Sequence, residues 1–255
     1  MNNDRIAVIL GELRLHKVVK IDYLAKKCFV STYTIRRDLE KLEQKGIVRR
    51  SFGKVALIED EFTASSFAVR RTLRNDGKKI IGELAADYVS DGNTILLSAS
   101  STVACIVPFL KKKKGLTIVT NSLPLAEKCT EELKNAEVIS IGGAVNPIMS
   151  ATYGTTACEQ LRQYVYDVNF FSAKGLSPEY GVMAINDEVA AFIRFTMNQS
   201  RKSICLCDGQ KFGIQTNHIL APFGSFYGLV TDKTPDEKWM KLFDSAGLEV
   251  VSPNG

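Results

Sequence analysis

The spacing of hydrophobic and polar residues changes character near residue 76. Before that point, apolar residues recur at helical spacing in short runs, at residues 5–13, 21–28 and 35–42. After it, apolar runs of strand length alternate with helical patterns. Such alternation favours a mostly parallel sheet whose two faces are both covered by helices. The pattern therefore predicts a small helical N-terminal domain followed by a larger α/β domain.

The third helical run has the composition of a DNA-binding helix. Ser31 is suited to be its N-cap, because a serine hydroxyl can accept a hydrogen bond from a first-turn amide. Ile35 and Leu39 place one face of this helix inward. Arg36 and Arg37 are then left on the other face, where they can neutralise phosphates or pair with guanine. Taken alone, the run also fits an ordinary amphipathic surface helix.

The residues on either side of this run favour a DNA-binding domain. Only Phe29 and Val30 separate it from the preceding helical run, and two short helices joined by a tight turn form a helix-turn-helix. Gly46 is well placed to end the helix, and residues 47–50 and 52–57 have the pattern of a small hairpin, which we interpret as a wing. The residues expected to contact bases or phosphates are Ser31, Thr32, Tyr33, Thr34, Arg36, Arg37, Arg49, Arg50 and Lys54.

Charge is distributed unevenly along the chain. Residues 1–58 contain 13 Lys and Arg against 6 Asp and Glu, a net charge of +7, whereas the other 197 residues carry a net charge of −2. A basic N-terminal domain favours a polyanionic partner such as double-stranded DNA. The four lysines at 111–114 are expected to form a solvated turn instead, because they lie between an apolar run and a strand-like run.

Small polar residues follow most of the predicted strands of the second domain. The strands are expected at 94–97, 116–119, 138–141, 168–171, 204–206 and 228–230, and helices at 123–133, 155–164 and 187–198. Open α/β sheets bind ligands at the carboxyl ends of their strands, although the same residue types also collect in ordinary turns. Hydroxyls and lysines there favour a small polar or phosphorylated ligand. The expected ligand-binding residues are Lys78, Ser98, Ser100, Ser101, Thr102, Thr120, Asn121, Ser122, Gly142, Gly143, Lys174, Asp208 and Lys211.

Length and composition limit the remaining classes of protein. No apolar run reaches the roughly 18 residues of a membrane span, and the N-terminus lacks the apolar core of a signal peptide, so we expect a cytoplasmic chain without a membrane partner. The six cysteines lack the spacing of a zinc site, and His16 and His218 are isolated. We therefore expect neither a metal site nor a cofactor, and we expect Cys205 and Cys207 to be buried thiols.

The N-terminal domain resembles the signature of the DeoR family of bacterial transcriptional regulators. The residues that carry this resemblance are Arg5, Ile9, Leu13, Ser31, Thr34, Ile35, Arg36, Arg37, Asp38 and Leu39. The resemblance continues through nearly the whole chain, with landmarks at Lys78, Thr120-Asn121-Ser122, Gly142-Gly143, Ser150, Gly154, Asp167, Asp208 and Lys211. It implies a second domain similar in fold to ribose-5-phosphate isomerase and glucosamine-6-phosphate deaminase. It also implies a regulator, usually a repressor, whose affinity for its operator changes when a phosphorylated sugar or related metabolite binds.

Some positions depart from the pattern of that family. The first ligand loop typically has the sequence Asp-x-Gly-Thr-Thr, whereas Ser98, Ser100 and Ser101 replace its first, third and fourth positions. Lys174 stands where an aspartate is common, and Lys54 replaces the second glycine of the wing. The lost carboxylate removes an acceptor for sugar hydroxyls, and the lost glycine restricts close approach to a phosphate. These changes favour either a more anionic effector or a sensor without a small-molecule response.

Three classes of function follow from these features. A DNA-binding regulator accounts for both domains, and a homodimer or higher homo-oligomer is expected because one helix-turn-helix contacts only a short site. An enzyme of the isomerase or deaminase type needs a base, for which the ligand loops offer only Asp208, with Asp232 further away, so no catalytic residue is expected. An architectural DNA-binding oligomer without an effector is the third class. The expected parts are a winged helix-turn-helix domain at 1–58, a linker at 59–76 and an α/β domain for effector sensing and oligomerisation at 77–255.

Overall fold

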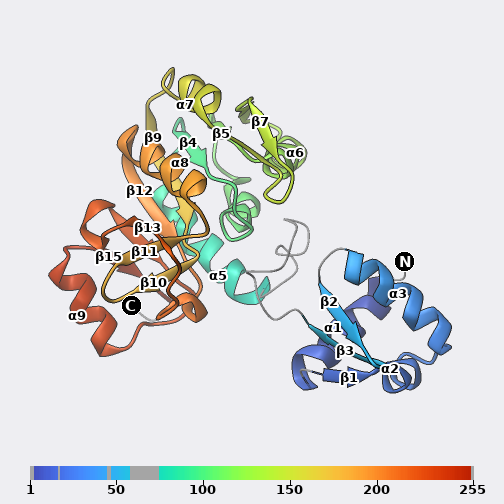
Figure 1. Cartoon of the computed structure of the whole chain (residues 1–255). Helices are drawn as coiled ribbons and strands as arrows, with labels where there is room; N and C mark the ends of the chain where they lie inside the picture. The colour runs from blue at the N-terminus through green and yellow to red at the C-terminus, as the bar shows by residue number, and fades with distance from the viewer. Residues whose placement is uncertain (1–2, 17, 45–46, 58–74, 254–255) are drawn as a thin grey trace. The chain divides into compact units, whose positions relative to one another are not determined.

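The chain divides into two compact units, residues 1–73 and 74–255. The computed structural model describes residues 3–16, 18–44, 47–57 and 75–253 (Figure 1). Most of the predicted linker at 59–76 lies outside the described residues, and so does Gly46, the predicted end of the third helix.

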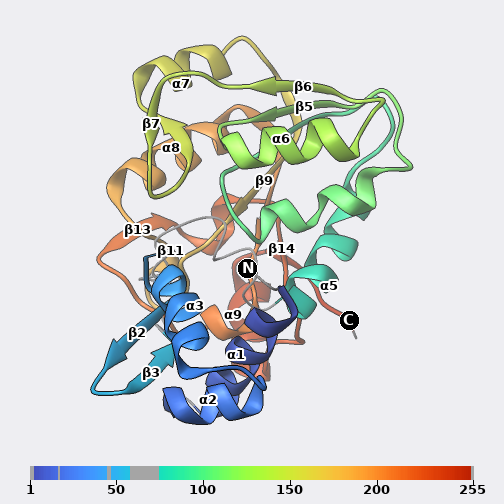
Figure 2. The same cartoon turned by 90° about the vertical axis from the view of Figure 1, so that its right-hand side faces the viewer.

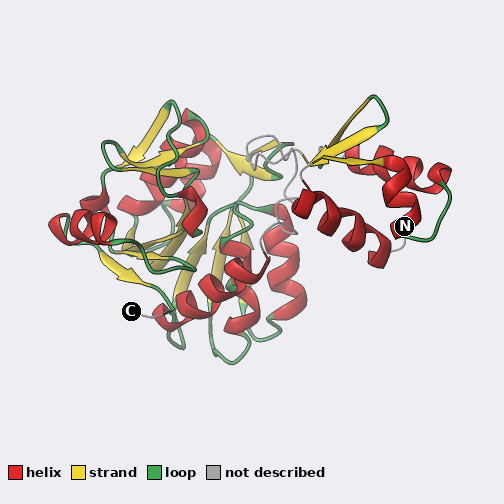
Figure 3. Ribbon diagram, turned by 90° about the horizontal axis from the view of Figure 1, so that it is seen from below, coloured by secondary structure: helices red, strands yellow, loops and turns green. Residues whose placement is uncertain are grey.

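The described residues of the N-terminal unit form three helices and a small antiparallel sheet (Figure 3). Its elements are α1 (Asn3–His16), β1 (Val18–Lys20), α2 (Ile21–Lys27), α3 (Thr32–Gln44), β2 (Val48–Ser51) and β3 (Lys54–Leu57). The three predicted helical runs and the hairpin β2–β3, the wing, are confirmed. Strand β1, which pairs with β3, was not predicted, because three residues are too short to show a period.

Apolar side chains and one ion pair hold the three helices together. Ile9 of α1, Leu24 of α2 and Ile35 of α3 are completely buried in one cluster. At its edge, Arg5 Nε donates to Asp38 Oδ2 over 2.6 Å, and Asp38 is only 4% exposed. This hydrogen bond raises the pKa of Arg5. The pair ties the start of α1 to the middle of α3.

The second unit is an α/β domain built on a parallel sheet of seven strands. The elements along it are α5 (Asn75–Ala85), η1 (Ala86–Tyr88), β4 (Thr94–Leu97), η2 (Val103–Cys105), η3 (Val107–Leu110), β5 (Thr117–Thr120), α6 (Leu123–Glu132), β6 (Glu137–Ser140), β7 (Ala144–Asn146), β8 (Ala151–Tyr153), α7 (Thr155–Leu161), β9 (Tyr166–Ser172), β10 (Gly175–Ser177), β11 (Gly181–Ala184), α8 (Asp187–Asn198), β12 (Ser200–Leu206), η4 (Gly209–Lys211), β13 (His218–Ala221), η5 (Phe223–Ser225), β14 (Gly228–Val230), α9 (Glu237–Ser245) and β15 (Glu249–Val251). The sheet order is β15-β14-β12-β9-β4-β5-β6, and every neighbouring pair is parallel. The predicted mostly parallel sheet is confirmed.

Both faces of this sheet are covered, as its apolar strands require. Leu96 of β4 packs in a cluster with Phe192 and Ile193 of α8, whereas Ile95 and Leu97 on the other face of the strand are also completely buried. Helix α6 lies along β5 and β6 (Figure 2). All six predicted strands of the sheet and the three predicted helices are present, and their boundaries agree with the predicted ones to within four residues.

Several short strands were not predicted. Strands β10, β11 and β13 form an antiparallel sheet, β7 and β8 form a hairpin, and β15 completes the edge of the main sheet. Each has only three or four residues. Their pairing is therefore decided by contacts with distant segments and leaves little periodicity in the sequence.

The order of the strands fixes where a ligand can bind. The first strand of this sheet along the chain is β4, which lies in the interior of the sheet. The chain then forms β5 and β6 outward on one side of β4, and returns to the other side of β4 to form β9. In sheets of this kind, the crevice lies where the strand order reverses, at the carboxyl ends of the strands. The loops after β4 and β9 therefore flank the expected ligand position. We call this side of the sheet the carboxyl edge.

Other expectations from the sequence concern residues outside both sites. Of the four lysines at 111–114, Lys113 is half-buried and the other three are exposed, as a solvated turn requires. Cys205 and Cys207 are buried, as predicted. Within the described ranges, no helix is both long and apolar enough to cross a membrane.

Helix α5 packs so closely on the loop after β4 that a methyl group at Gly82 would overlap the carbonyl oxygen of Cys105. We therefore expect Gly82→Ala to lower the free energy of unfolding of the second unit by about 1–3 kcal/mol. Urea unfolding followed by the fluorescence of Trp239, the single tryptophan of the chain, measures this.

Gly11 provides the matched control, because it lies exposed in α1 with nothing within 4 Å of an added Cβ. Gly11→Ala should stabilise the N-terminal unit by about 0.5–1 kcal/mol, since alanine is the better helix former. Circular dichroism follows that transition. A Gly82→Ala protein as stable as the wild type would contradict the close packing of α5.

Candidate nucleic-acid interface and ligand site

The start of α3 is fixed by its own side chains. The backbone N–H of Thr34 donates to Ser31 Oγ over 3.2 Å, which confirms the predicted N-cap. The two hydroxyls, Ser31 Oγ and Thr34 Oγ1, lie 3.0 Å apart and share a further hydrogen bond. The predicted DNA-contacting residues Ser31 and Thr34 therefore also set the geometry of the helix start.

The face of α3 that points away from the core presents cations to solvent. Arg36 and Arg37 are exposed, and Tyr33 is 75% exposed, while Thr32 is half-buried. No ion pair involving Arg36 or Arg37 is formed with the residues that the structure describes. These side chains are therefore accessible to the phosphates and base edges of DNA.

The cations of the wing differ in their surroundings. Arg49 and Lys54 are exposed, whereas Arg50 is bound to Glu43 of α3. Its Nη2 and Nε lie 2.6 and 2.7 Å from Glu43 Oε2, and its backbone N–H donates to Glu43 Oε1 over 2.9 Å. The backbone hydrogen bond and the guanidinium lower the pKa of Glu43. Arg50 thus fastens the wing to α3, a role that sequence reasoning missed.

A groove runs between α3 and the tip of the wing. Its lining combines two cations and one acid with small and aromatic residues, namely Ile21, Arg36, Glu43, Arg50, Ser51, Phe52 and Gly53. Because Glu43 is already paired with Arg50, the charge that remains in the groove is positive. A strand of the DNA backbone has the complementary charge.

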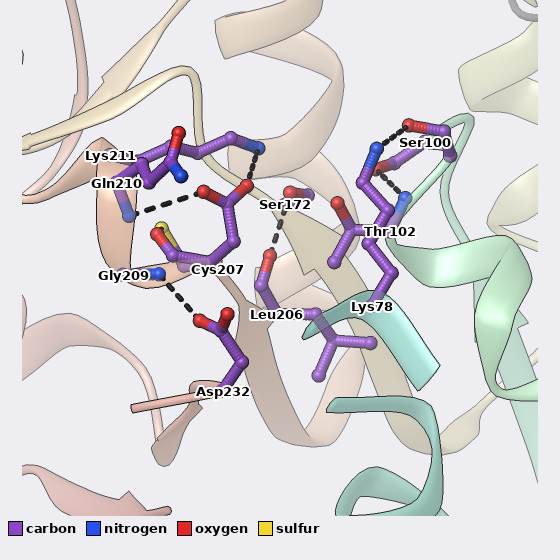
Figure 4. A network of polar contacts seen from close by, with 12 residues as sticks. Lys78, Ser100, Thr102, Ser172, Leu206, Cys207, Gly209, Gln210, Lys211 and Asp232 are labelled. Atoms are coloured by element: carbon purple, nitrogen blue, oxygen red, sulfur yellow. Dashed lines mark hydrogen bonds and ion pairs between the residues drawn. The ribbon is translucent and has the colours of Figure 1, made fainter. Parts of the chain in front are cut away.

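In the second unit, a buried lysine reaches the loop after β4. Lys78 of α5 is completely buried, and its Nζ donates to Ser101 Oγ over 3.1 Å (Figure 4). The N–H of Thr102 donates to Ser100 Oγ over 3.1 Å in the same loop. Two of the predicted ligand residues, Ser100 and Ser101, are thus engaged in holding the loop and the lysine.

The Thr120-Asn121-Ser122 triplet after β5 has a structural role as well. Asn121 Oδ1 accepts from the N–H of Ala99 over 3.0 Å, and its Nδ2 donates to the carbonyl of Thr152 over 2.9 Å. Thr120 Oγ1 donates to the carbonyl of Leu97 over 2.6 Å. These bonds join the ends of β4, β5 and β8, so Thr120 and Asn121 shape the site from within the protein.

Four buried hydroxyls at the carboxyl edge have no hydrogen-bond partner among the described residues. They belong to Ser98 and Thr102 after β4, Ser122 after β5 and Thr231 after β14, all at most 4% exposed. Buried polar groups are normally hydrogen-bonded, because an unsatisfied one costs about 1–3 kcal/mol. These four hydroxyls therefore have hydrogen-bonding capacity left for a ligand.

Two carboxylates organise the loop after β12. Asp208 Oδ2 lies 3.6 Å from Lys211 Nζ, and both residues are buried. Asp232, which follows β14, accepts from the N–H of Gly209 over 2.7 Å (Figure 4). Sequence reasoning treated Asp232 as remote and omitted Thr231. The rule that polar residues after a strand lie at the carboxyl edge identifies both when it is applied to β14.

The remaining predicted ligand residues lie further apart. Lys174 is half-buried in the loop after β9, beside the reversal of strand order. Gly142 and Gly143 follow β6 at the edge of the sheet, two strands from β4, and the N–H of Gly142 donates to Gln160 Oε1 of α7 over 3.0 Å. The structure therefore brings Lys78 into contact with the loop after β4, whereas the glycine pair is hydrogen-bonded to α7.

Metal binding finds no support in the arrangement of side chains. Within the described part of the chain, no group of three or more His, Cys, Asp or Glu residues is positioned to hold a metal ion. The two acids of the ligand loops are engaged, Asp208 with Lys211 and Asp232 with the N–H of Gly209. What the edge offers is hydroxyl donors and buried ammonium groups, which suit an anionic ligand.

Family models match both units. Residues 5–61 match the DeoR-like helix-turn-helix domain, and residues 74–233 match the DeoR C terminal sensor domain. The second match alone covers more than half of the chain.

Similar proteins extend along nearly the full length. The HTH-type transcriptional repressor GlcR of Bacillus subtilis is 28% identical over 97% of this chain and 95% of the relative. The uncharacterized HTH-type transcriptional regulator YgbI of Escherichia coli is 31% identical over 90% of this chain and 89% of its own length. Among solved structures, ribose 5-phosphate isomerase A from Methanocaldococcus jannaschii aligns with a TM-score of 0.40 and 14% identity over 54% of each chain.

Adjacent residues of the triplet after β5 should respond differently to mutation. Asn121→Ala removes two hydrogen bonds to buried backbone and should lower the free energy of unfolding by about 2–4 kcal/mol. Ser122→Ala removes a hydroxyl without a partner among the described residues, so the stability should stay within about 1 kcal/mol of the wild type. Urea unfolding measures both. Equal losses in the two variants would contradict the assignment of Asn121 to structure and of Ser122 to ligand binding.

Proposed function

The chain belongs to the DeoR family of transcriptional regulators, and from this premise we propose that it is a repressor that releases its operator when a small anionic metabolite binds. The single observation that carries the DNA-binding half is the exposed basic face of α3, held in place by Asp38 on one side and Glu43 on the other. The repressor name of the Bacillus subtilis relative supports the direction of the effect. The relatives are named regulators, and the protein is a regulator and not an enzyme.

In this proposal, α3 lies in the major groove and the wing follows the adjacent backbone. Tyr33, Thr34, Arg36 and Arg37 contact bases or phosphates, and Arg49 and Lys54 contact phosphates. One such helix covers only a short half-site, so selective binding uses two copies of the chain on two half-sites. The second unit supplies the contacts between copies, and the complex forms in the cytoplasm, where the operator is.

The proposed effector is a phosphorylated sugar or a related anionic metabolite at the carboxyl edge. The unpartnered hydroxyls of Ser98, Thr102 and Ser122 donate to its oxygens, and the ammonium group of Lys78 balances part of its charge, while Lys211, paired with Asp208, donates a further hydrogen bond. The loop with Ser98 in place of an acid favours a ligand more anionic than a neutral sugar. This is the chemistry that the described side chains support best.

Helix α5 is the element proposed to connect the two sites. It directly follows the residues that join the two units, and it carries Lys78 into the carboxyl edge. A ligand that accepts the hydrogen bond of Lys78 in place of Ser101 changes the contacts that fix the position of α5. Because Gly77 packs on Asp232 and Gly82 on Cys105 without room for a methyl group, α5 has few intermediate positions. Differential affinity of the ligand for the two positions then couples effector binding to DNA binding.

The salt dependence of DNA binding tests the assignment of the arginines. The duplex is first selected from a random pool with the full-length wild-type protein. Arg36→Ala and Arg37→Ala should each reduce the slope of log K against log salt by about 0.9, the contribution of one phosphate contact. Arg50→Ala should instead lower the thermal stability of the N-terminal unit, because Glu43 loses the guanidinium and keeps only the backbone N–H of residue 50.

Lys112→Ala, in the exposed turn of the second unit, is the control and should leave both the slope and the stability unchanged. An unchanged slope for both the Arg36 and the Arg37 variant would contradict the proposed interface. Recovery of no sequence preference at moderate salt would favour an architectural role instead.

Calorimetric titration with a panel of sugar phosphates tests the effector site. One or more members should release heat with the wild-type protein and dissociate the selected duplex. Lys78→Met should abolish both effects while DNA binding persists, because the lysine belongs to the sensor unit. No heat from any member, with DNA binding intact, would contradict a sugar-phosphate effector.

A further inference from the structure

The tip of the wing carries a fully exposed aromatic ring. Phe52 has a relative exposure of 102%, the highest among the exposed large hydrophobic residues that are described. A phenyl ring on a surface usually packs part of its area on a neighbour, because water contact with apolar area is unfavourable. Phe52 therefore contributes nothing to the core of its own unit.

The backbone at this position also disfavours phenylalanine. Ser51 pairs with Lys54, so the wing turns through only Phe52 and Gly53. Both have positive φ, 47° and 73°, as a type I′ turn requires. Glycine, asparagine and aspartate suit the first position of this turn, whereas a bulky residue with positive φ is uncommon. Neither packing nor turn geometry explains why this residue is aromatic.

The two hollows beside Phe52 each contain basic residues among apolar ones. On one side, Phe52 lines the groove shared with Arg36 of α3. On the other side, it lines a second hollow with Arg49 and Lys54. The ring thus projects from the turn between cations that suit two phosphate strands, as in a minor groove flanked by its backbones.

We propose that Phe52 enters the minor groove next to the half-site of α3 and partly separates the stacked bases of one step, which kinks the DNA. The inference rests on the proposed function, since it needs α3 in the major groove. The faces of stacked bases are the apolar surface that DNA can offer to a phenyl ring, and apolar wedges of this kind open base steps from the minor groove. Pyrimidine–purine steps resist least, so the operator should carry one at this position.

The test compares variants on the duplex that the full-length wild-type protein selects from a random pool. The bend angle is measured by circular permutation, and unstacking by 2-aminopurine placed in turn at each step of the adjacent minor groove. The wild type should bend the duplex and raise the 2-aminopurine fluorescence at one step. Phe52→Gly should lose both signals and bind ~10- to 100-fold more weakly, the value of burying one phenyl ring.

Phe52→Gly is chosen because glycine relieves the positive φ of the turn, so its loss of bending does not come from a misfolded wing. Its salt slope should equal that of the wild type, because no charge is removed. Phe29→Gly is the matched control. Phe29 also has positive φ, 53°, and is 94% exposed, but it lies in the turn before α3 and not on the wing. This control should keep the bend and the fluorescence signal.

The outcomes separate the inference from the proposed function. No selective DNA binding by the wild type would reject the proposed function itself. Selective binding in which Phe52→Gly retains the bend and the 2-aminopurine signal would overturn the wedge alone. A second selection with Phe52→Gly should lose the preference for a pyrimidine–purine step at one position and keep the bases contacted by α3. An unchanged sequence preference would also overturn it.

Discussion

Two carboxylates on α3 determine which of its charged groups face solvent. Asp38 is buried and bound to Arg5 of α1, and Glu43 binds both the backbone and the side chain of Arg50 in the wing. Each of these two acids is satisfied by a residue from another element, and the third acid of α3, Glu40, is exposed and forms no ion pair with Arg36 or Arg37 among the described residues. The positions of α1 and of the wing relative to α3, and the positive charge of the groove between α3 and the wing, depend on this pairing.

The carboxyl edge of the second unit shows a similar division of labour among polar groups. Asn121 and Ser100 use their hydrogen bonds to hold the loops that end β4 and β5. Ser122 directly follows Asn121, and Ser98 lies two residues before Ser100. Both serines keep buried hydroxyls without partners among the described residues. A parallel sheet brings all these loops to one side, because all its strands point the same way. Loops that are preorganised by some residues can then offer others to a ligand at low entropic cost.

Close packing around α5 limits how this helix can move. Gly77 and Gly82 let the helix approach Asp232 and the backbone of Cys105, and Lys78 between them reaches into the site. A helix held at two such points moves as a body or not at all, since a packed interface has few intermediate states. The helix is also the first element after the residues that join the two units.

The sequence by itself determined the helices of the N-terminal unit, the N-cap at Ser31, the wing and the parallel sheet, because helix caps and hydrophobic periods are local properties. Only the tertiary structure decided that Arg50 pairs with Glu43, that Thr231 and Asp232 join the carboxyl edge, and that β1, β10, β11, β13 and β15 are strands. It also decided which serines of the loop after β4 are engaged, since Ser100 and Ser98 are alike in composition and differ only in their neighbours. Hydrogen-bond partners and short strands depend on segments far away in the chain, and a local pattern carries no record of them.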